Sequence, residues 1–172
     1  MERHSIEAIF RALGAARVRY LVVGGLAVVA HGYVRLTADV DLFIDLEPAN
    51  VDRSLAALKR LGYRPRAPVE LEAFADPHKR AEWVRDKGLT VFSMYSPDHA
   101  ATEVDLFVEA PLDFEAAYQV AEAMEVAPGV EATFVGLQDL LRLKRRAGRA
   151  QDQLDIENLE ALGEPGTGRP QP

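Results

Sequence analysis

Apolar residues recur along this chain with two different periods, and these periods separate predicted helices from predicted strands. Over residues 2–16 the apolar positions fall three or four apart, which predicts an amphipathic helix. Residues 18–23, VRYLVV, form an unbroken β-branched and apolar run that ends at two glycines, which predicts a buried strand. The rest of the chain alternates between the same two patterns.

The pattern predicts an α/β (α+β) domain built around one central mixed sheet flanked by helices, with two helices at the C-terminal end. Further strands are predicted at 40–45, 89–96, 103–109 and 131–136, and further helices at 26–32, 48–61, about 112–124, 137–147 and 150–162. Residues 63–88 have weak periodicity and predict a loop, or a strand plus a loop. We expect one domain over 1–163 and a disordered tail over 164–172, where Pro and Gly are frequent.

Composition narrows the class of protein further. The 172 residues are 48% hydrophobic and 27% charged, which is ordinary for a globular protein. No cysteine is present, so disulfides and cysteine-based zinc sites are excluded. The net charge of −7 argues against a generally basic, nucleic-acid-coating surface, and no run approaches the roughly 20 apolar residues of a membrane span. These features predict a cytoplasmic protein without a membrane partner.

The segment VRLTADVDLFID carries the strongest chemical signal. Asp39 and Asp41 are two positions apart, so in a strand their side chains leave the same face. Asp105 lies in EVDLFVE, a second short apolar strand of the same type. If the two strands are neighbours, three carboxylates converge. Solvent exposure of one polar strand face is the simpler alternative, but the repetition at Asp105 argues against it.

Converging carboxylates need a compensating charge. Two like charges about 4 Å apart repel by roughly 4 kcal/mol at an effective dielectric near 20. Such a cluster therefore raises a pKa or binds a cation, and oxygen ligands favour Mg²⁺, which takes its remaining ligands from water and substrate phosphates. The predicted cofactor is Mg²⁺.

Gly24 and Gly25 stand at a predicted strand-to-helix turn. Paired glycines allow a backbone to approach a phosphate closely, although they also simply make turns. The spacing in GGLAVVAHG differs from the G-x-G-x-x-G dinucleotide pattern.

Taken together, VVGGLAVVAHGYVRLTADVDLFID resembles the nucleotidyltransferase superfamily typified by DNA polymerase β. The signature is Gly-Gly or Gly-Ser on a turn, followed by Asp-x-Asp among apolar residues. AHGYVRLTADVDL is most similar to the AbiEii-type group of toxin–antitoxin and abortive-infection systems. The resemblance continues through LGYRP and EVDLF to LLRLKRRAGRAQDQLDIENL, so it covers roughly residues 18 to 162.

The resemblance implies transfer of a nucleoside monophosphate from an NTP, such as ATP, to a hydroxyl acceptor. It implies that Asp39, Asp41 and Asp105 hold two metal ions, and that Asp105 also takes the proton from the attacking hydroxyl. It places Gly24 and Gly25 on the β- and γ-phosphates. Gly25 stands where many relatives have serine, so a backbone contact replaces a hydroxyl contact there.

The predicted helix at 137–147 adds basic groups. Lys144 lies in line with the apolar stripe of this helix, so it either extends to solvent or meets an anion. The resemblance places Lys144 and Arg149 at the nucleotide. The run from 142 to 149 has five basic residues and no acid, which is either a solvated face or a contact for RNA or nucleotide phosphate.

Four residues near these groups have two interpretations each. Arg35 contacts either the triphosphate or water, and Thr37 either binds phosphate or caps the entry to the strand. Asp152 and Asp155 lie at the head of the last predicted helix, where they complement the helix dipole or pair with Lys144 and Arg149.

We therefore expect a nucleotidyltransferase that acts on tRNA or other RNA or on a protein, within a toxin–antitoxin pair that includes a cognate antitoxin or partner. A catalytically silent module that binds a partner or nucleotide is the alternative. A haloacid-dehalogenase-like phosphatase is excluded because its first aspartate follows an apolar strand, whereas YVRLTA precedes Asp39. A glycosyltransferase normally needs a longer chain.

Overall fold

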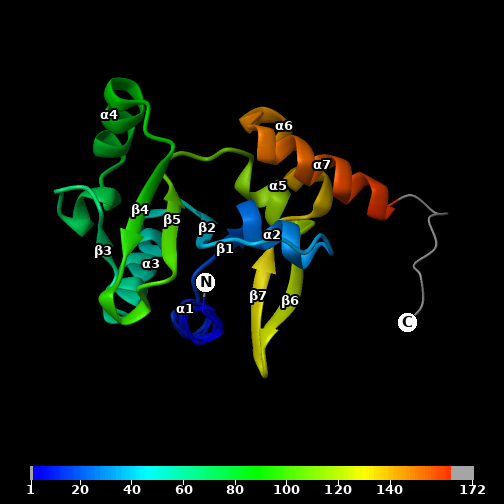
Figure 1. The fold of residues 1–172 in the computed structure, drawn as a ribbon. Helices are drawn as coiled ribbons and strands as arrows, with labels where there is room; N and C mark the ends of the chain where they lie inside the picture. The colour runs from blue at the N-terminus through cyan, green and yellow to red at the C-terminus, as the bar shows by residue number, and fades with distance from the viewer. Residues whose placement is uncertain (1, 164–172) are drawn as a thin grey trace.

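The computed structural model describes residues 2–163, and its seven described strands form one mixed sheet with helices around it (Figure 1). The strands are β1 (Tyr20–Val22), β2 (Asp39–Ile44), β3 (Arg64–Pro65), β4 (Val91–Tyr95), β5 (Glu103–Phe107), β6 (Glu122–Ala127) and β7 (Val130–Phe134). The α-helices are α1 (Arg3–Ala15), α2 (Gly24–Ala30), α3 (Pro48–Arg60), α4 (Pro77–Lys87), α5 (Phe114–Gln119), α6 (Leu137–Ala147) and α7 (Ala150–Gly163). Two 3-10 helices, η1 (Leu71–Ala75) and η2 (Pro97–His99), complete the described elements. The predicted α/β class with a central mixed sheet and two C-terminal helices is confirmed.

Strand pairing brings together the two segments that carry aspartates. The strand order is β3-β4-β5-β2-β1-β7-β6. β2 runs parallel to β5 and antiparallel to β1, and β4 runs antiparallel to β5. Parallel neighbours require a long connection, and here α3, β3, η1, α4 and β4 lie between β2 and β5 in the chain. The predicted adjacency of these two strands is confirmed.

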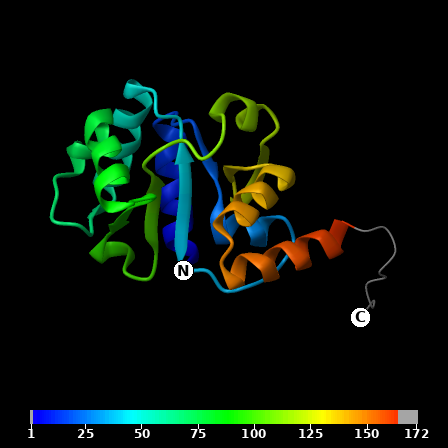
Figure 2. The ribbon, with the colours of Figure 1, turned by 90° about the horizontal axis from the view of Figure 1, so that it is seen from above.

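The helices bury their apolar sides against this sheet and against one another. α1 contributes Ile9, Phe10 and Leu13 to the core, which are the residues at helical spacing in the sequence. α2 packs on β2 and against α6, and α7 follows α6 in the chain and contacts it (Figures 1 and 2). α6 ends at Gly148, whose φ of +66° is a left-handed conformation that suits glycine.

Residues 63–88 contain a helix that the sequence interpretation placed in a loop. α4 has the local signals of a helix, because the Asp76 side chain accepts from the His78 N–H at 2.8 Å and Pro77 occupies the first turn. It ends at Gly88 in the left-handed region. Only Arg80 and Trp83 are buried, so the apolar period is too weak to reveal it.

The predicted helix over 112–124 is shorter than expected and is followed by a strand. α5 ends at Gln119, and residues 122–127 form β6, an outer strand of the sheet. β6 is mostly exposed and pairs antiparallel with β7 through a tight connection. Pairing with β7 therefore overrides the local helix preference of this segment, which is rich in Ala and Glu.

No helix in residues 2–163 combines the length and the apolar character needed to cross a bilayer. The predicted tail over 164–172 lies outside the described residues.

Candidate active site

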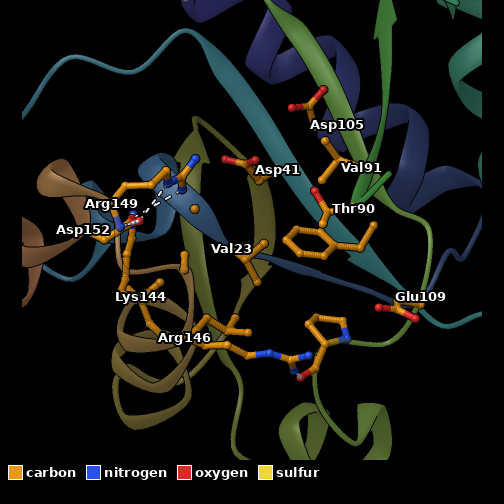
Figure 3. Close-up of a pocket in the computed structure, with 16 residues that line it drawn as sticks. Val23, Asp41, Thr90, Val91, Asp105, Glu109, Lys144, Arg146, Arg149 and Asp152 are labelled. Carbon is orange, nitrogen blue, oxygen red and sulfur yellow. Dashed lines mark hydrogen bonds and ion pairs between the residues drawn. The ribbon is translucent and has the colours of Figure 1, made fainter. Parts of the chain in front are cut away.

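A cavity of about 440 Å³ lies between the sheet and the α6–α7 pair, and its size is typical of small-ligand sites (Figure 3). Strands β2, β4 and β5 border one side, and α6 with the start of α7 borders the other. The lining residues are Val23, Gly24, Asp41, Thr90, Val91, Asp105, Phe107, Glu109, Pro111, Leu140, Leu143, Lys144, Arg146, Ala147, Arg149 and Asp152. Most of the predicted chemistry is therefore at one place.

Asp41 and Asp105 form an acidic wall on the sheet side of this cavity. They are direct register partners in the parallel β2–β5 ladder, and both side chains are turned toward the cavity (Figure 3). Val40 and Leu42 face the core with no exposed surface, which fixes the aspartates on the opposite face. Asp39 shares this face one pair further along, opposite Glu103, and does not line the cavity.

No described basic side chain forms an ion pair with the acidic wall. Asp39, Asp41 and Asp105 make no ion pair with any described Lys, Arg or His within 4.0 Å. Burial, aided by the charge of Asp105, raises the pKa of Asp41 to about 6, although the Gly25 N–H donates to this carboxylate and opposes the rise. Burial likewise raises the pKa of Asp105, against a hydrogen bond from Ser93. Burial and mutual repulsion make the ionised carboxylates unfavourable, so binding of a positive ligand would stabilise them.

The first two residues of α2 are glycines, and side chains of the segment from Arg35 to Asp41 pack directly on them. Gly24 has a φ of +62°, and a Cβ at this position would overlap the carboxylate of Asp41. A Cβ on Gly25 would lie 2.5 Å from Thr37 Oγ1 and 2.9 Å from an Arg35 nitrogen. Gly24 lines the cavity, whereas Gly25 is buried behind it.

Gly24→Ala is therefore expected to destabilise the protein by more than Gly88→Ala. Gly88 has nearly the same φ of +60°, but a Cβ there would have no neighbour within 4 Å. Gly88→Ala should cost only the left-handed strain, about 1–2 kcal/mol. Gly24→Ala should add roughly 1–3 kcal/mol for displacing Asp41. Urea unfolding of both variants measures the difference, and equal losses would show that the site tolerates a side chain at position 24.

Lys144 and Arg149 form a basic wall on the helix side of the cavity, opposite the acidic wall. Its side chain is 5% exposed, and Nζ lies 2.9 Å from Asp152 Oδ1 and 2.8 Å from Asp155 Oδ2. Both carboxylates are essentially buried, at 1% and 0% side-chain exposure. Of the two interpretations of these aspartates, the structure therefore shows the pairing with Lys144. The charge of Lys144 also lowers the pKa of Asp41, so the lysine acts electrostatically across the cavity.

Arg149 stands beside Lys144 at the start of α7. Asp152 accepts from the Arg149 backbone N–H at 3.2 Å and from Nε at 2.8 Å, so it caps the helix in the way that a residue at the third position does. The hydrogen bond to Asp152 raises the pKa of Arg149, and the charge of Asp41 adds to the rise. Arg149 and Lys144 together form the basic wall, on the side of the cavity opposite Asp41 (Figure 3).

Most of the basic run on α6 is neutralised within the chain. Arg142 pairs with Asp139 at 2.8 Å and Arg145 with Glu160 at 2.5 Å. Arg146 lines the cavity and donates to the Pro111 carbonyl oxygen at 3.2 Å. The run consequently does not form one free basic surface, because Arg142 and Arg145 are paired on the exposed side of the helix and Arg146 lies at the cavity.

The structure brings some of the predicted site residues together and leaves others aside. Gly24, Asp41, Asp105, Lys144 and Arg149 line the cavity, whereas Gly25, Arg35, Thr37 and Asp39 do not.

Two polar residues of the cavity, Thr90 and Glu109, were not anticipated. A signal for Glu109 exists, because Asp105, Phe107 and Glu109 are two apart and all line the cavity. Thr90 precedes β4 and carries no such pattern.

The acidic side chains do not form a finished ligand set by themselves. Within residues 2–163, no group of three or more His, Asp or Glu side chains is arranged so that it could hold a metal ion. What the described arrangement supplies is the donor chemistry: carboxylate oxygens without a positive partner.

Comparison with known proteins identifies the fold. No protein-family model matches this chain, and no curated protein matches it by sequence. The solution structure of the antibiotic-resistance factor ANT(2'')-Ia matches with a TM-score of 0.58 and 14% identity, over 94% of this chain and 83% of that one. An antigenic nucleotidyltransferase-like protein from Paracoccidioides brasiliensis matches with a TM-score of 0.55 and 18% identity, over 96% and 78%.

These neighbours define the class of fold. The chain has the nucleotidyltransferase fold, with its mixed sheet and flanking helices, as the sequence resemblance implied. The AbiEii-type likeness is finer than these matches resolve.

Proposed function

We propose that this protein is a Mg²⁺-dependent nucleotidyltransferase that transfers a nucleoside monophosphate from an NTP to a hydroxyl acceptor. One observation carries the proposal: an acidic wall that no described basic side chain pairs with faces a basic wall across one cavity. Asp41 and Asp105 provide the first wall, and Lys144 and Arg149 provide the second. A triphosphate with its divalent ions has this alternation of charge, because the phosphates are negative and the ions are positive.

The chemistry of the carboxylate donors suits magnesium. Asp39, Asp41 and Asp105 would hold two Mg²⁺ ions, and hard carboxylate oxygens on rigid strands are the ligands this ion prefers. Binding would relieve the burial and repulsion that raise the pKa of Asp41 and Asp105. When bound, Mg²⁺ stabilises the negative charge that develops on the phosphoryl oxygens.

In this proposal each side chain of the cavity has a separate role in nucleotidyl transfer. Arg149, whose side chain is 75% exposed, contacts the phosphates, the buried Lys144 adds positive charge behind it, and the Gly24 backbone permits close approach beside Asp41. Asp105, whose pKa is raised, accepts the proton of the acceptor hydroxyl. The hydroxyl oxygen forms a bond to the α-phosphorus, the α–β phosphoanhydride bond breaks, and pyrophosphate leaves. In this proposal the reaction draws on a cytoplasmic NTP pool.

The acceptor we propose is an RNA end, with tRNA included, or a protein hydroxyl. Because Arg142 and Arg145 are paired within the chain, the basic run gives RNA no preference over protein. The AbiEii-type motifs support a place in a toxin–antitoxin pair, in which a cognate partner would control access to the cavity.

Incubation with α-labelled NTPs and Mg²⁺ in the presence of total tRNA or a cell lysate tests the activity. We expect label in one macromolecular fraction together with release of pyrophosphate. Asp41→Asn should reduce transfer at least about a hundredfold, because it removes a direct carboxylate ligand. Asp45→Asn is the matched control, since Asp45 follows the same strand but pairs with Arg19 at 2.8 Å.

A catalytically silent nucleotide-binding module is the second candidate. The lack of a finished ligand set among the described acidic side chains favours it. In this case the protein would bind NTP without transfer to any fraction, and Asp41→Asn would leave nucleotide binding nearly unchanged.

A further inference from the structure

The segment between α2 and β2, residues 31–38, is held in place mainly by the side chain of Arg35. The last backbone hydrogen bond before it runs from Tyr33 to the Val28 carbonyl at 3.2 Å. From there to Asp39 the described chain makes no backbone-to-backbone hydrogen bond. Val34 and Leu36 are 82% and 96% exposed, so neither side chain holds the segment in place. Arg35, between them, is turned inward and is only 18% exposed.

Arg35 reaches the first turns of α7, 120 residues further along the chain. Its Nη2 donates to Asp155 Oδ2 at 3.2 Å, and its Nε lies 2.9 Å from Oδ1 without the alignment of a hydrogen bond. Its Nη1 donates to the neighbouring Leu36 carbonyl at 2.9 Å, which fixes the turn of the segment. Figure 2 shows this segment passing beside the start of α7.

Asp155 is the point at which the segment and the basic wall meet. This fully buried carboxylate also receives Lys144 Nζ at 2.8 Å and Gln151 Nε2 at 3.0 Å. One carboxylate therefore joins the Arg35 segment, α6 and α7. The same segment is packed from the other side, because Arg35 and Thr37 fill the space that a side chain at Gly25 would occupy.

We propose that Arg35 is a positioning residue that sets the acidic wall in register with the basic wall. This inference rests on the proposed function, because it concerns how Mg²⁺ and a triphosphate are held together. Arg35 does not line the cavity, so it acts through Asp155 and through the two aspartates that follow it in the chain. The link fixes the start of β2 relative to Lys144, where one ligand must contact both walls.

The change that Mg²⁺ causes in polyphosphate affinity tests whether the two walls are correctly positioned relative to each other. Inorganic tripolyphosphate is the probe, since it carries the charge of an NTP without a base, and calorimetry gives its affinity with and without Mg²⁺. For the wild type we expect Mg²⁺ to tighten binding about tenfold or more, because the acidic wall would hold Mg²⁺ while the basic wall holds the phosphates that Mg²⁺ also binds. In Arg35→Met, binding without Mg²⁺ should change less than about threefold, since Lys144 and Arg149 remain, and the tightening by Mg²⁺ should fall to about twofold or less.

Arg19→Met is the matched control. Arg19 is a partly exposed arginine that joins Asp45 and Glu115 at 2.8 and 2.5 Å, outside the cavity. Arg19→Met should lower thermal stability while leaving the tightening of tripolyphosphate binding by Mg²⁺ intact. It therefore distinguishes the loss of the Arg35–Asp155 contact from a general loss of stability. Arg35→Lys keeps the charge but loses the two-point contact, so we expect its tightening to be intermediate, and this variant decides the question if Arg35→Met does not fold.

Two failures are distinguishable. If the wild type shows no Mg²⁺ tightening, the proposed function is wrong. If the wild type shows it and Arg35→Met, or failing that Arg35→Lys, retains it in full, then Arg35 is only structural and the inference is overturned.

Discussion

Asp41→Asn is expected to stabilise the ligand-free protein above pH 6, although the same change should abolish transfer. Folding raises the pKa of Asp41 from 3.8 to about 6, so the folded state holds this proton more tightly than the unfolded state does. At about 1.4 kcal/mol per pKa unit, ionisation of Asp41 costs the folded protein roughly 2–3 kcal/mol of unfolding free energy. Asparagine is neutral and nearly isosteric, so it removes this cost.

The pH dependence has a definite sign. Well below pH 3.8 the carboxyl is protonated in both states and makes no difference to stability. As pH rises from 4 through 6, the unfolded state releases the proton first, and the wild type loses stability. Asp41→Asn should therefore match the wild type well below pH 3.8 and exceed it by the full amount at pH 8.

Urea unfolding at pH 5 and pH 8, with and without Mg²⁺, measures this effect. Mg²⁺ should stabilise the wild type at pH 8 and should leave Asp41→Asn nearly unchanged, because the ion binds the folded carboxylates. Asp45→Asn should instead lose stability, since it breaks the pair with Arg19. If Asp41→Asn were less stable than the wild type at pH 8, its carboxylate would already be compensated and the case for an ion would fail.

Lys144→Met is expected to be the most destabilising of the proposed substitutions. It removes the cation shared by Asp152 and Asp155, both of which are buried. Loss of one partner from a buried ionic group typically costs about 3–5 kcal/mol, because the remaining charge stays desolvated. The pair Arg145–Glu160 links the same two helices at the surface, with about half of each side chain exposed. Arg145→Gln should therefore cost less than about 1 kcal/mol.

The cluster of Lys144, Asp152 and Asp155 should also make stability depend on pH in the acid range. The sign is opposite to that for Asp41, because here stability falls as pH falls. Burial alone would raise the pKa of Asp152, but hydrogen bonds from Arg149 and Lys144 outweigh it and hold the pKa at about 2. The stability that this carboxylate contributes is present above about pH 4 and is lost as pH falls toward 2. Acid titration should show a smaller loss over this range in Lys144→Met than in the wild type. An unchanged acid slope would mean that Arg149 alone lowers the pKa.

The fold could be predicted where local pattern and tertiary environment agree. β2 and β5 carry aspartates on one face and Val40, Leu42, Val104 and Leu106 on the other, so their alternation predicted both strands and the shared face. α4 was missed because only two of its residues are buried. β6 was read as helix because its preference for β structure comes from β7 rather than from its own residues.

The candidate site divides in the same way. The motif predicted that Asp41, Asp105 and Lys144 belong together, and they line one cavity. It could not show that Arg35 and Thr37 turn away from this cavity, because both interpretations satisfy the same local sequence. Glu109 was missed although it continues the alternation of Asp105 and Phe107, since the predicted strand was read only for its apolar residues and for Asp105.

The sequence by itself determined the chemical parts and their order: paired glycines, aspartates on one strand face, and a lysine aligned with an apolar helix stripe. These follow from periods of two and of three to four residues, which act over short distances along the chain. Tertiary structure alone decided that Asp41 faces Asp105 across a parallel ladder and that Arg35 meets Asp155. Such pairs lie 64 and 120 residues apart (105 − 41 and 155 − 35), and only the burial and charge of the folded chain select them.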